Sequence, residues 1–287
     1  MDGTAIDWLT GRLLQALAGG EAATPAAATL LLRRYVATGR DDLRDALGPV
    51  LAGALEASGV ERDSSRRSEW VALFVEASEL SDDDRLRHAA GALVGALRGL
   101  WPSRGDIAPA MRSVGACLLA AGDDNARTLV PAAIDELERI VGLAYEPGEG
   151  LTHAIHDPSG KAGDLGDHVA ASSALLTAHA VTGRLPYSML AEELMQFARR
   201  SWWDEARGGF PASPAPFVSN CESVRVLCRL AALHGDADYR KAAVVAHHSD
   251  YADDAKRTLE SLELSYRDQG LDAAWYGIAL GEYLSLT

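Results

Sequence analysis

Ionisable side chains are concentrated in one segment near the middle of the chain. They are His153, His156, Asp157, Asp164, Asp167 and His168. Carboxylates and imidazoles serve as general acids and bases where burial tunes their pKa values. We therefore predict catalytic roles for Asp167 and His168, and substrate contacts for His153, His156 and Asp164. The alternative is structural, because Asp164 or Asp167 could cap the helix that follows while the loop histidines face solvent.

A second group of candidates opens the helix expected to start near residue 220. Asn220 is a good N-cap residue, and Glu222 would lie close to the positive end of the helix dipole. Glu222 and Arg225 are three residues apart, so they share one face of that helix. We predict that Glu222 is catalytic and that Asn220 and Arg225 contact substrate. Glu222 and Asp167 would suit glycoside hydrolysis if their carboxyl groups faced each other across a bond.

Aromatic residues close to these groups form a predicted platform for a sugar ring. Trp202 and Trp203 come shortly before a Gly-Gly-Phe210 sequence. Aromatic faces can stack on sugars, but a tryptophan that fills the core between helices is the structural alternative. Trp70 and Tyr276 fall on helices expected to face the site, where they would contact substrate or simply pack.

Nothing in the sequence indicates a metal or a cofactor. His153, His156 and Asp157 do not have the spacing of a zinc site. The three cysteines are Cys117, Cys221 and Cys228. They form no CxxC pair, so we expect small buried residues in a reducing compartment.

Two charged motifs suggest other ligands. Asp41-Asp42-Leu-Arg-Asp45 matches the DDxxD pattern of class I terpene synthases, which bind a magnesium diphosphate. It falls at a hairpin turn, away from the predicted site, and similar acidic turns recur elsewhere, so we interpret it as a helix start. Arg66 and Arg67 oppose the dipole of another predicted helix start. This hints at anion binding, although a solvated charge pair is the simpler interpretation.

The composition limits the class of protein. The chain has 287 residues, 48% apolar content and a net charge of -14. An acidic chain with no Lys/Arg run is a poor partner for nucleic acid. No apolar stretch approaches the roughly 20 residues that span a bilayer, and no basic segment of a signal peptide opens the sequence. We expect a soluble, cytoplasmic, single domain over residues 1–287 that binds a small molecule.

One sequence pattern of helix ends and helix starts recurs along the chain and predicts helical hairpins. An apolar helix ends in a short turn with glycine, and an acidic stretch with arginine opens the next helix, as in Gly39-Arg-Asp-Asp-Leu-Arg44. The pattern predicts helices near 4–18, 24–38, 41–58, 65–79, 82–100, 106–121, 125–143, 166–182, 186–201, 220–234, 237–262 and 271–285. The eleventh is expected to break near His247–Tyr251. Six hairpins of this kind would close into an (α/α)6 toroid, an all-α ring.

The connections of this ring are unequal in length. Turns from inner to outer helices are short, whereas two outer-to-inner connections, 144–165 and 202–219, are long. Long loops in a compact domain are usually functional or disordered. Both would lie at one mouth of the ring, so we predict a pocket at the N-termini of the inner helices.

Four segments in the second half of the chain carry a resemblance. They are Ser201-Trp-Trp-Asp-Glu-Ala-Arg-Gly-Gly-Phe210, Gly166-Asp-His-Val-Ala170, Asn220-Cys-Glu-Ser-Val224 and the stretch from Leu227 to Arg240. They resemble the six-hairpin glycosidase-like superfamily over roughly residues 145–245. That superfamily includes N-acylglucosamine 2-epimerases and, closer in motif, the C-terminal toroid of thioredoxin-domain proteins related to spermatogenesis-associated protein 20 and YyaL.

The resemblance implies an α/α toroid with glycoside hydrolase or epimerase-like chemistry. His168 replaces the tyrosine at the corresponding position of the family, and the thioredoxin domain is absent. A non-catalytic binding or scaffold ring is therefore the main alternative, and its sign would be an axis filled by side chains such as Trp275, without facing carboxylates. An isoprenoid cyclase is a remote one.

Overall fold

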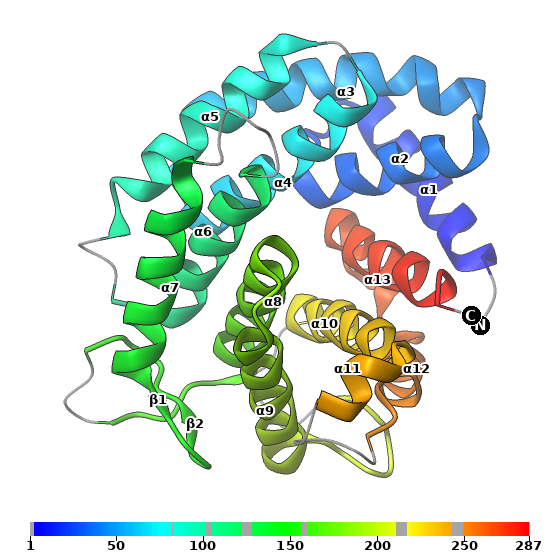
Figure 1. Cartoon of the computed structure of the whole chain (residues 1–287). Helices are drawn as coiled ribbons and strands as arrows, with labels where there is room; N and C mark the ends of the chain where they lie inside the picture. The colour runs from blue at the N-terminus through cyan, green and yellow to red at the C-terminus, as the bar shows by residue number, and fades with distance from the viewer. Residues whose placement is uncertain are drawn as a thin grey trace.

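The computed structural model describes residues 3–81, 83–101, 105–121, 128–156, 160–210, 217–242 and 249–286. Helices dominate, and they form two concentric layers (Figure 1). The inner layer consists of α2 (Pro25–Thr38), α4 (Ser64–Leu80), α6 (Ile107–Ala120), α8 (Leu165–Thr182), α10 (Phe217–Gly235) and α13 (Ala274–Leu284). The outer layer consists of α1 (Thr4–Ala18), α3 (Asp41–Val60), α5 (Asp84–Arg98), α7 (Val130–Ala144), α9 (Leu185–Trp202), α11 (Ala237–Ala242) and α12 (Tyr251–Leu262).

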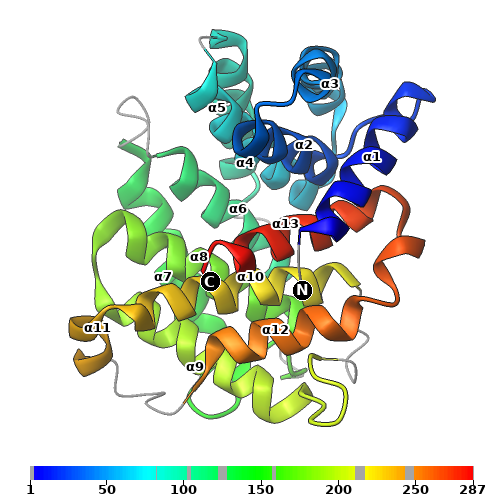
Figure 2. The ribbon, with the colours of Figure 1, turned by 90° about the vertical axis from the view of Figure 1, so that its right-hand side faces the viewer.

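The six inner helices close into a ring. Each packs against the next in chain order, and α13 packs against α2 to complete the circle. Helix α1 also contacts α13, so the first and last hairpins meet at one seam, as the turned view shows (Figure 2). The predicted fold class, an (α/α)6 toroid, is confirmed.

Local signals of the sequence set most helix ends. Gly39 and Gly183 take left-handed conformations, with φ of 65° and 68°, and end α2 and α8 as predicted. Thr24 caps α2 and is followed by proline at the first helical position. Asp41 and Asp42 of the DDxxD motif occupy the first turn of α3, where Asp41 pairs with Arg44. The interpretation of that motif as a helix start is confirmed.

Two helices differ from the prediction. The segment 237–262 is not one helix, because α11 ends at Ala242 and α12 begins at Tyr251, close to the break expected near His247–Tyr251. Helix α10 begins at Phe217, three residues before the predicted start, so Asn220 lies inside the first turn and is not the N-cap.

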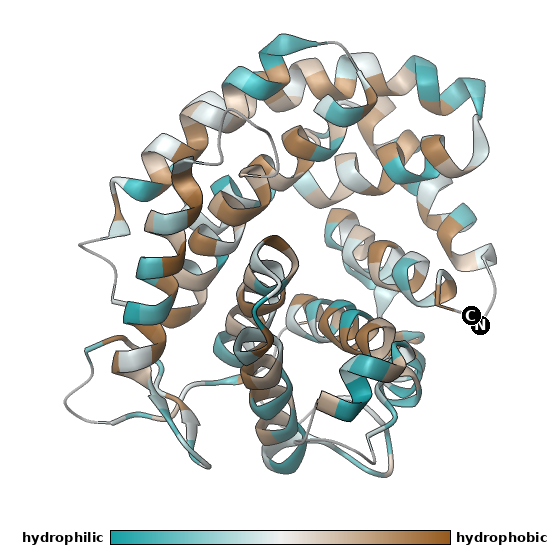
Figure 3. Ribbon diagram, viewed as in Figure 1, coloured by the Kyte–Doolittle hydropathy of each residue, from teal (hydrophilic) through white to brown (hydrophobic). Residues whose placement is uncertain are grey.

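The core lies between the two layers, where apolar faces meet (Figure 3). It includes Leu31, Leu73, Phe74, Val114, Leu176, Leu194, Leu227 and Leu259. At the seam, Gly277 of α13 lies so close to α2 that an added Cβ would come within 2.6 Å of a Leu30 methyl carbon. A larger residue at this position would have to displace the Leu30 side chain.

Strands are confined to a small hairpin, β1 (Tyr145–Glu146) with β2 (Gly150–Leu151), in the described part of the chain. It belongs to the long connection between α7 and α8, and Thr152 and Ala154 extend it through single bridges to Ala162 and Asp106. Two short 3-10 helices, η3 (Tyr266–Asp268) and η4 (Gly270–Ala273), lead into α13. Among the described residues, no helix is both long and apolar enough to cross a membrane.

Candidate active site at the axis of the ring

The inner helices turn polar side chains toward the ring axis in three layers. The upper layer holds Glu69, Arg112 and Glu222, each the sixth residue of its helix. The middle layer holds Arg33, Ser173, Arg225 and Glu282, each the ninth residue. The lower layer holds Glu76, Thr177 and Arg229, each the thirteenth. Equal offsets from the helix starts place each set at one depth, because all inner helices begin at the same mouth.

An ion pair crosses the upper layer. The Arg112 guanidinium donates to both carboxylate oxygens of Glu222, at 2.6 Å and 3.3 Å. Arg112 belongs to α6 and Glu222 to α10, and these helices flank α8. The two side chains are 23% and 16% exposed, so the pair is shielded but within reach of solvent. A two-point contact of this kind holds a carboxylate in a fixed orientation.

Glu69 is the carboxyl group of the upper layer that can keep its proton near neutral pH. Burial raises its pKa to about 7, with further upward contributions from Glu222 and Asp272 that Arg66 and Arg112 oppose. Its Oε2 atom is buried and has no hydrogen-bond partner among the described residues. A carboxyl group that keeps its proton near neutrality, beside a fixed carboxylate, has the properties of a general acid.

Positive charge exceeds negative charge in the two deeper layers. Arg33 binds Glu76 at 2.8 Å and Glu282 at 2.7 Å, and Arg225 binds Glu282 at 2.9 Å. Arg229 has no carboxylate within pairing distance among the described residues. It donates to the carbonyl oxygen of Ser173 at 3.1 Å and to the Thr177 hydroxyl at 3.2 Å. The two deeper layers therefore contain three guanidinium groups and only two carboxylates, Glu76 and Glu282, among the described residues.

The pKa values of Glu282 and Arg229 shift in the directions expected for an excess of positive charge in these layers. Burial opposes the charge of Glu282, but Arg225 and Arg33 outweigh it and lower the pKa of this carboxyl group. Burial lowers the pKa of Arg229 to about 10, and neighbouring Arg225 adds to the effect. An incompletely neutralised cationic group at this depth favours an anionic ligand.

Asp167 is buried at the start of α8, where it acts in a capping box with Asp164. Its Oδ2 accepts from the Asp164 backbone N–H at 3.0 Å and from His153 Nδ1 at 2.7 Å. Its Oδ1 accepts from the Ala108 N–H of α6 at 3.1 Å. Burial raises the pKa of Asp167, and the bond from His153 opposes that rise. The predicted catalytic carboxylate thus connects two helices and a loop.

His168 is fully buried and has both ring nitrogens occupied. Nδ1–H donates to the Asp164 carbonyl oxygen at 2.8 Å, and Nε2 accepts from the Leu151 N–H at 3.1 Å. The ring stacks on Phe197 with centroids 4.9 Å apart. Gly150, at φ 81°, passes so close that an added Cβ would lie 2.5 Å from His168 Nε2. The predicted proton transfer by His168 does not fit this geometry, because no ring nitrogen faces substrate.

The environment of His168 makes stability depend on pH. Burial lowers its pKa, so the native state holds the neutral ring, whereas the unfolded chain binds a proton below a pH of about 6.5. We expect the free energy of unfolding to fall as pH drops below that value. Urea unfolding at several pH values should show a flatter dependence for His168→Gln, which will be less stable than wild type at neutral pH. An equally steep dependence in the variant would contradict this assignment.

The predicted aromatic platform lies away from the axis. Trp202 ends α9 and packs edge-on against His168 and Phe197, and Trp203 lies between the guanidinium groups of Arg199 and Arg257. Phe210 is buried against Trp203, and its N–H donates to Asn220 Oδ1 at 3.1 Å. These contacts are structural, so stacking of a sugar on Trp202, Trp203 or Phe210 does not fit, and Asn220 fastens the loop before α10.

The remaining candidates are spread over the ring. Trp70 is buried and stacks on Phe74, and Tyr276 is buried and stacks on Tyr266. His156 is exposed, and Asp157 lies outside the described residues. The three cysteines are buried and form no disulfide, as expected. Of the predicted substrate contacts, Arg225 lies on the axis and His153 is fixed near the upper layer through Asp167.

Sequence reasoning missed Glu69, Arg112 and Arg229. Each of them lies a fixed number of residues after the start of its inner helix. This regularity becomes visible only when the inner helices are aligned by their first residues. Residues at one offset in parallel helices lie at one depth. Glu69 directly precedes Trp70, but the pattern of that segment draws attention only to its two arginines.

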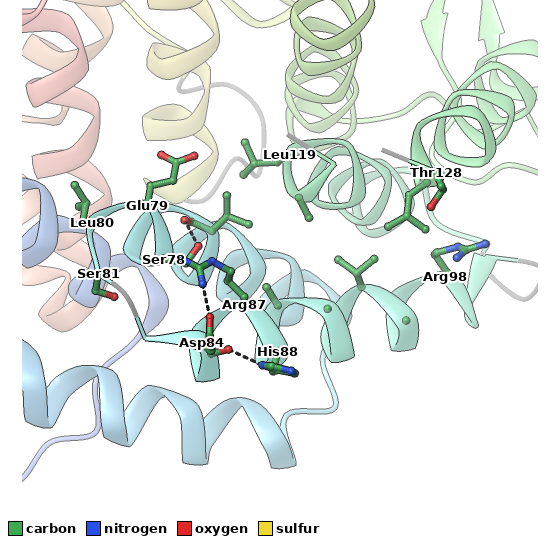
Figure 4. Close-up of a pocket in the computed structure, with 17 residues that line it drawn as sticks. Ser78, Glu79, Leu80, Ser81, Asp84, Arg87, His88, Arg98, Leu119 and Thr128 are labelled. Atoms are coloured by element: carbon green, nitrogen blue, oxygen red, sulfur yellow. Dashed lines mark hydrogen bonds and ion pairs between the residues drawn. The ribbon is translucent and has the colours of Figure 1, made fainter. Parts of the chain in front are cut away.

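Two hollows lie outside the axial layers. One, of about 1200 Å³, lies between α5 and the C-terminal ends of α4 and α6 (Figure 4). Its charged groups pair locally, as Arg87 binds Asp84 and His88 Nδ1 contacts the Asp84 carbonyl. The other, of about 660 Å³, lies at the seam beside Trp8 and Tyr266. Neither contains Glu69 or Glu222.

Side-chain ligand atoms of His153, Asp164 and Asp167 lie within 4.8 Å of one another, close enough to hold an ion. Their mutual hydrogen bonds already account for this proximity. Asp164 caps α8, and Asp167 accepts from three donors. The donor set therefore fits a helix cap better than a metal centre.

Solved structures share this fold. No protein-family model and no curated protein sequence matches the chain. An unsaturated glucuronyl hydrolase specific for heparin is 12% identical, with a TM-score of 0.74, over 99% of this chain and 96% of its own. A GH76A α-1,6-mannanase from Salegentibacter sp. HEL1_6 is 10% identical, with a TM-score of 0.66, over 99% of both chains. D-mannose isomerase is 12% identical, with a TM-score of 0.61, over 78% and 72%. These structures and this chain share the fold of an (α/α)6 toroid.

Proposed function

We propose that this protein is a carbohydrate-processing enzyme, a glycoside hydrolase that removes a terminal acidic sugar at the axis of the ring. The observation that carries the proposal is the upper layer, where a carboxyl group with a pKa of about 7, Glu69, interacts with the Arg112-bound carboxylate of Glu222. Glu69 would protonate the leaving oxygen. Glu222 would stabilise the positive charge that develops on the sugar ring.

The axial carboxylates favour an enzyme over a scaffold. A scaffold ring would have had an axis without facing carboxylates, yet Glu69 and Glu222 lie in one layer, and the charge of Glu222 contributes to the raised pKa of Glu69. Trp275 is buried, and the Arg225 guanidinium lies over its ring. An isoprenoid cyclase has less support, because Asp41 and Asp45 are exposed and pair with Arg44.

The deeper layers support an acidic substrate. Arg225 and Arg229 follow Glu222 on one face of α10, about 4–5 Å and about 10 Å further along the helix. A sugar whose glycosidic bond lies at the upper layer could place a carboxylate or sulfate near these guanidinium groups. Glucuronyl hydrolase activity in a protein of similar fold agrees with this choice.

The related toroid family, the cellular compartment and the kind of partner are proposed from the sequence. The four segments that carry the resemblance favour kinship with the toroids of the YyaL and spermatogenesis-associated protein 20 type. The acidic composition and the three scattered cysteines, which form no disulfide, support a cytoplasmic enzyme with a sugar ligand and without a nucleic-acid or membrane partner.

A direct test compares acidic and neutral substrates. Purified protein would be assayed on p-nitrophenyl glucuronide, glucoside and mannoside, and on unsaturated disaccharides prepared from glycosaminoglycans. We expect hydrolysis of at least one acidic substrate and slower turnover of the neutral ones. Preference for neutral glycosides would contradict the acidic class, and failure on every substrate would contradict hydrolysis of terminal acidic sugars.

Replacing Arg229 isolates the anion contact. Because one charge-assisted hydrogen bond contributes about 1.5–3 kcal/mol, Arg229→Gln should raise KM for an acidic substrate about tenfold or more. It should change KM for a neutral glycoside little. Arg12→Gln, on the exposed face of α1, is the control. Equal changes on acidic and neutral substrates would indicate a structural role for Arg229.

A further inference from the structure

We propose that His153 is the base that activates the attacking water, and that Asp167 is the residue that positions it. This inference rests on the proposed hydrolase function for its chemistry, but the pairing of the two residues can be tested without substrate. It gives Asp167 an indirect role, through the histidine, in place of direct contact with the sugar.

Asp167 is held immobile by its hydrogen bonds. Its side chain is 1% exposed and accepts from three donors on three segments, His153, Asp164 and Ala108. Three donors directed at one carboxyl group favour its ionised form. An ionised carboxylate cannot donate, so His153 Nδ1 must carry the proton of the 2.7 Å bond.

The other nitrogen of the His153 imidazole can accept a proton. Nδ1–H is committed to Asp167, so the neutral ring has its lone pair on Nε2. No hydrogen bond to Nε2 is formed within the described part of the chain, and the side chain is 39% exposed. A buried carboxylate on one nitrogen and an accessible lone pair on the other is the arrangement that orients a general base.

The backbone of His153 is fixed as well. Its carbonyl oxygen accepts from the Ile107 N–H at the start of α6, at 3.0 Å, and its N–H donates to the Lys161 carbonyl at 2.9 Å. The backbone of His153 is thus held by Lys161 of the same loop on one side and by the first turn of α6 on the other. A base held on both sides loses little entropy when the reaction needs it.

The pair of His153 and Asp167 lies beside the upper layer. Ala108, which donates to Asp167, lies one turn before Arg112 on α6. The charge of Asp167 also acts on the Arg112 guanidinium, which binds Glu222. His153 and Asp167 therefore lie at the mouth of the ring that is nearest the layer of Glu69 and Glu222.

The reaction then balances. A water oxygen bonds to the anomeric carbon as the bond from that carbon to the leaving oxygen breaks. His153 Nε2 takes a proton from the water, and Glu69 gives its proton to the leaving oxygen. Asp167 stabilises the imidazolium that forms. The proton on His153 and the empty site on Glu69 re-equilibrate through solvent before the next turnover.

The electrostatics of His153 agree with this role. The bond to Asp167 and its charge raise the pKa of the imidazole, while burial and Lys161 oppose the rise and Asp164 adds to it. A raised pKa makes the neutral ring a stronger base. Removing Asp167 should lower the pKa of His153.

Imidazole NMR titration of the purified, ¹⁵N-labelled protein tests the pairing. We expect the Nδ1–H tautomer and a pKa above the ordinary value of about 6.5 for His153, and a lower pKa in Asp167→Asn. Because that change also weakens the cap of α8, Asp164→Ala is the matched variant that weakens the cap and keeps the pair. His88, whose Nδ1 contacts only a backbone carbonyl, is the internal reference, and its signals should be the same in all three proteins. An Nε2–H tautomer, or a His153 pKa equally altered in both variants, would overturn the proposal.

Kinetics on a hydrolysed substrate test the base. His153→Gln should lower kcat about 100-fold with little change in KM. Asp167→Asn should lower kcat less and move the acidic limb of the pH profile to lower pH, while His88→Gln should match wild type. Full kcat in His153→Gln would overturn the role of the base. A wild type that hydrolyses nothing would defeat the proposed function, whereas the NMR titration would still support or overturn the pairing of His153 with Asp167.

Discussion

Replacing Glu69 by glutamine is expected to lower kcat by roughly 10²–10⁴-fold, the usual contribution of a general acid. Glutamine keeps the shape of the side chain but has no proton to transfer. In the wild type, kcat/KM should decline as pH rises through about 7, because Glu69 then loses its proton. Measured pH profiles should show that this basic limb is missing from the residual activity of the variant.

The same substitution should leave the fold intact. The pKa of Glu69 is raised on folding, so wild-type stability declines between a pH of about 4.5, the ordinary value, and about 7. Glu69→Gln lacks this decline and should be the more stable protein at pH 8, by about 1–3 kcal/mol. Glu79→Gln, at the exposed end of the same helix, should change neither property. An active or strongly destabilised Glu69→Gln protein would rule out the acid role of Glu69.

Replacing Glu282 by alanine is expected to cause a large loss of stability, about 2–4 kcal/mol in the free energy of unfolding. Glu282 compensates both Arg33 and Arg225, and its removal leaves two partly buried guanidinium groups without that partner. The expected loss is smaller than for a fully buried pair because the carboxylate is 24% exposed. Urea unfolding at neutral pH measures the difference.

The control for this prediction is a carboxylate of the outer layer. Glu260 pairs with Lys256 on the exposed face of α12, at 3.9 Å. Glu260→Ala should cost no more than about 0.5 kcal/mol, as for other surface pairs. If Glu282→Ala were as mild as Glu260→Ala, the axial network would contribute little to the closure of the ring.

Most of the fold could be predicted because its signals are local. A glycine that ends one helix and an acidic turn that starts the next act within a few residues, as Gly39 and Gly183 do. Six such hairpins leave few alternatives to a ring or an open solenoid. The start of α10 was placed too late because Asn220 suggests an N-cap, whereas it lies inside the helix and accepts from the Phe210 N–H.

The site was harder to predict because its signals are not local. The segment before α8 stands out for its density of ionisable groups, but a helix start also recruits such groups. Asp164 and Asp167 form the cap, and His168 lies in the core. Glu69 owes its character to burial and to charges on α6 and α10. No spacing within α4 could have revealed that, since only the register between hairpins brings those charges together.

The proposed reaction at the axial layers requires that the six hairpins have assembled into the closed ring. Arg33 and Glu282 are 249 positions apart in the sequence, and Arg112 and Glu222 are 110 apart. Each hairpin can form from neighbouring residues, whereas these bonds form only once hairpins far apart in the chain have docked. A partly assembled chain would therefore have helices but no organised acid, anion contact or counter-charge. Each axial ion pair thus reports on ring closure, and enzymatic activity would be the most sensitive measure of whether the last hairpin has joined the first.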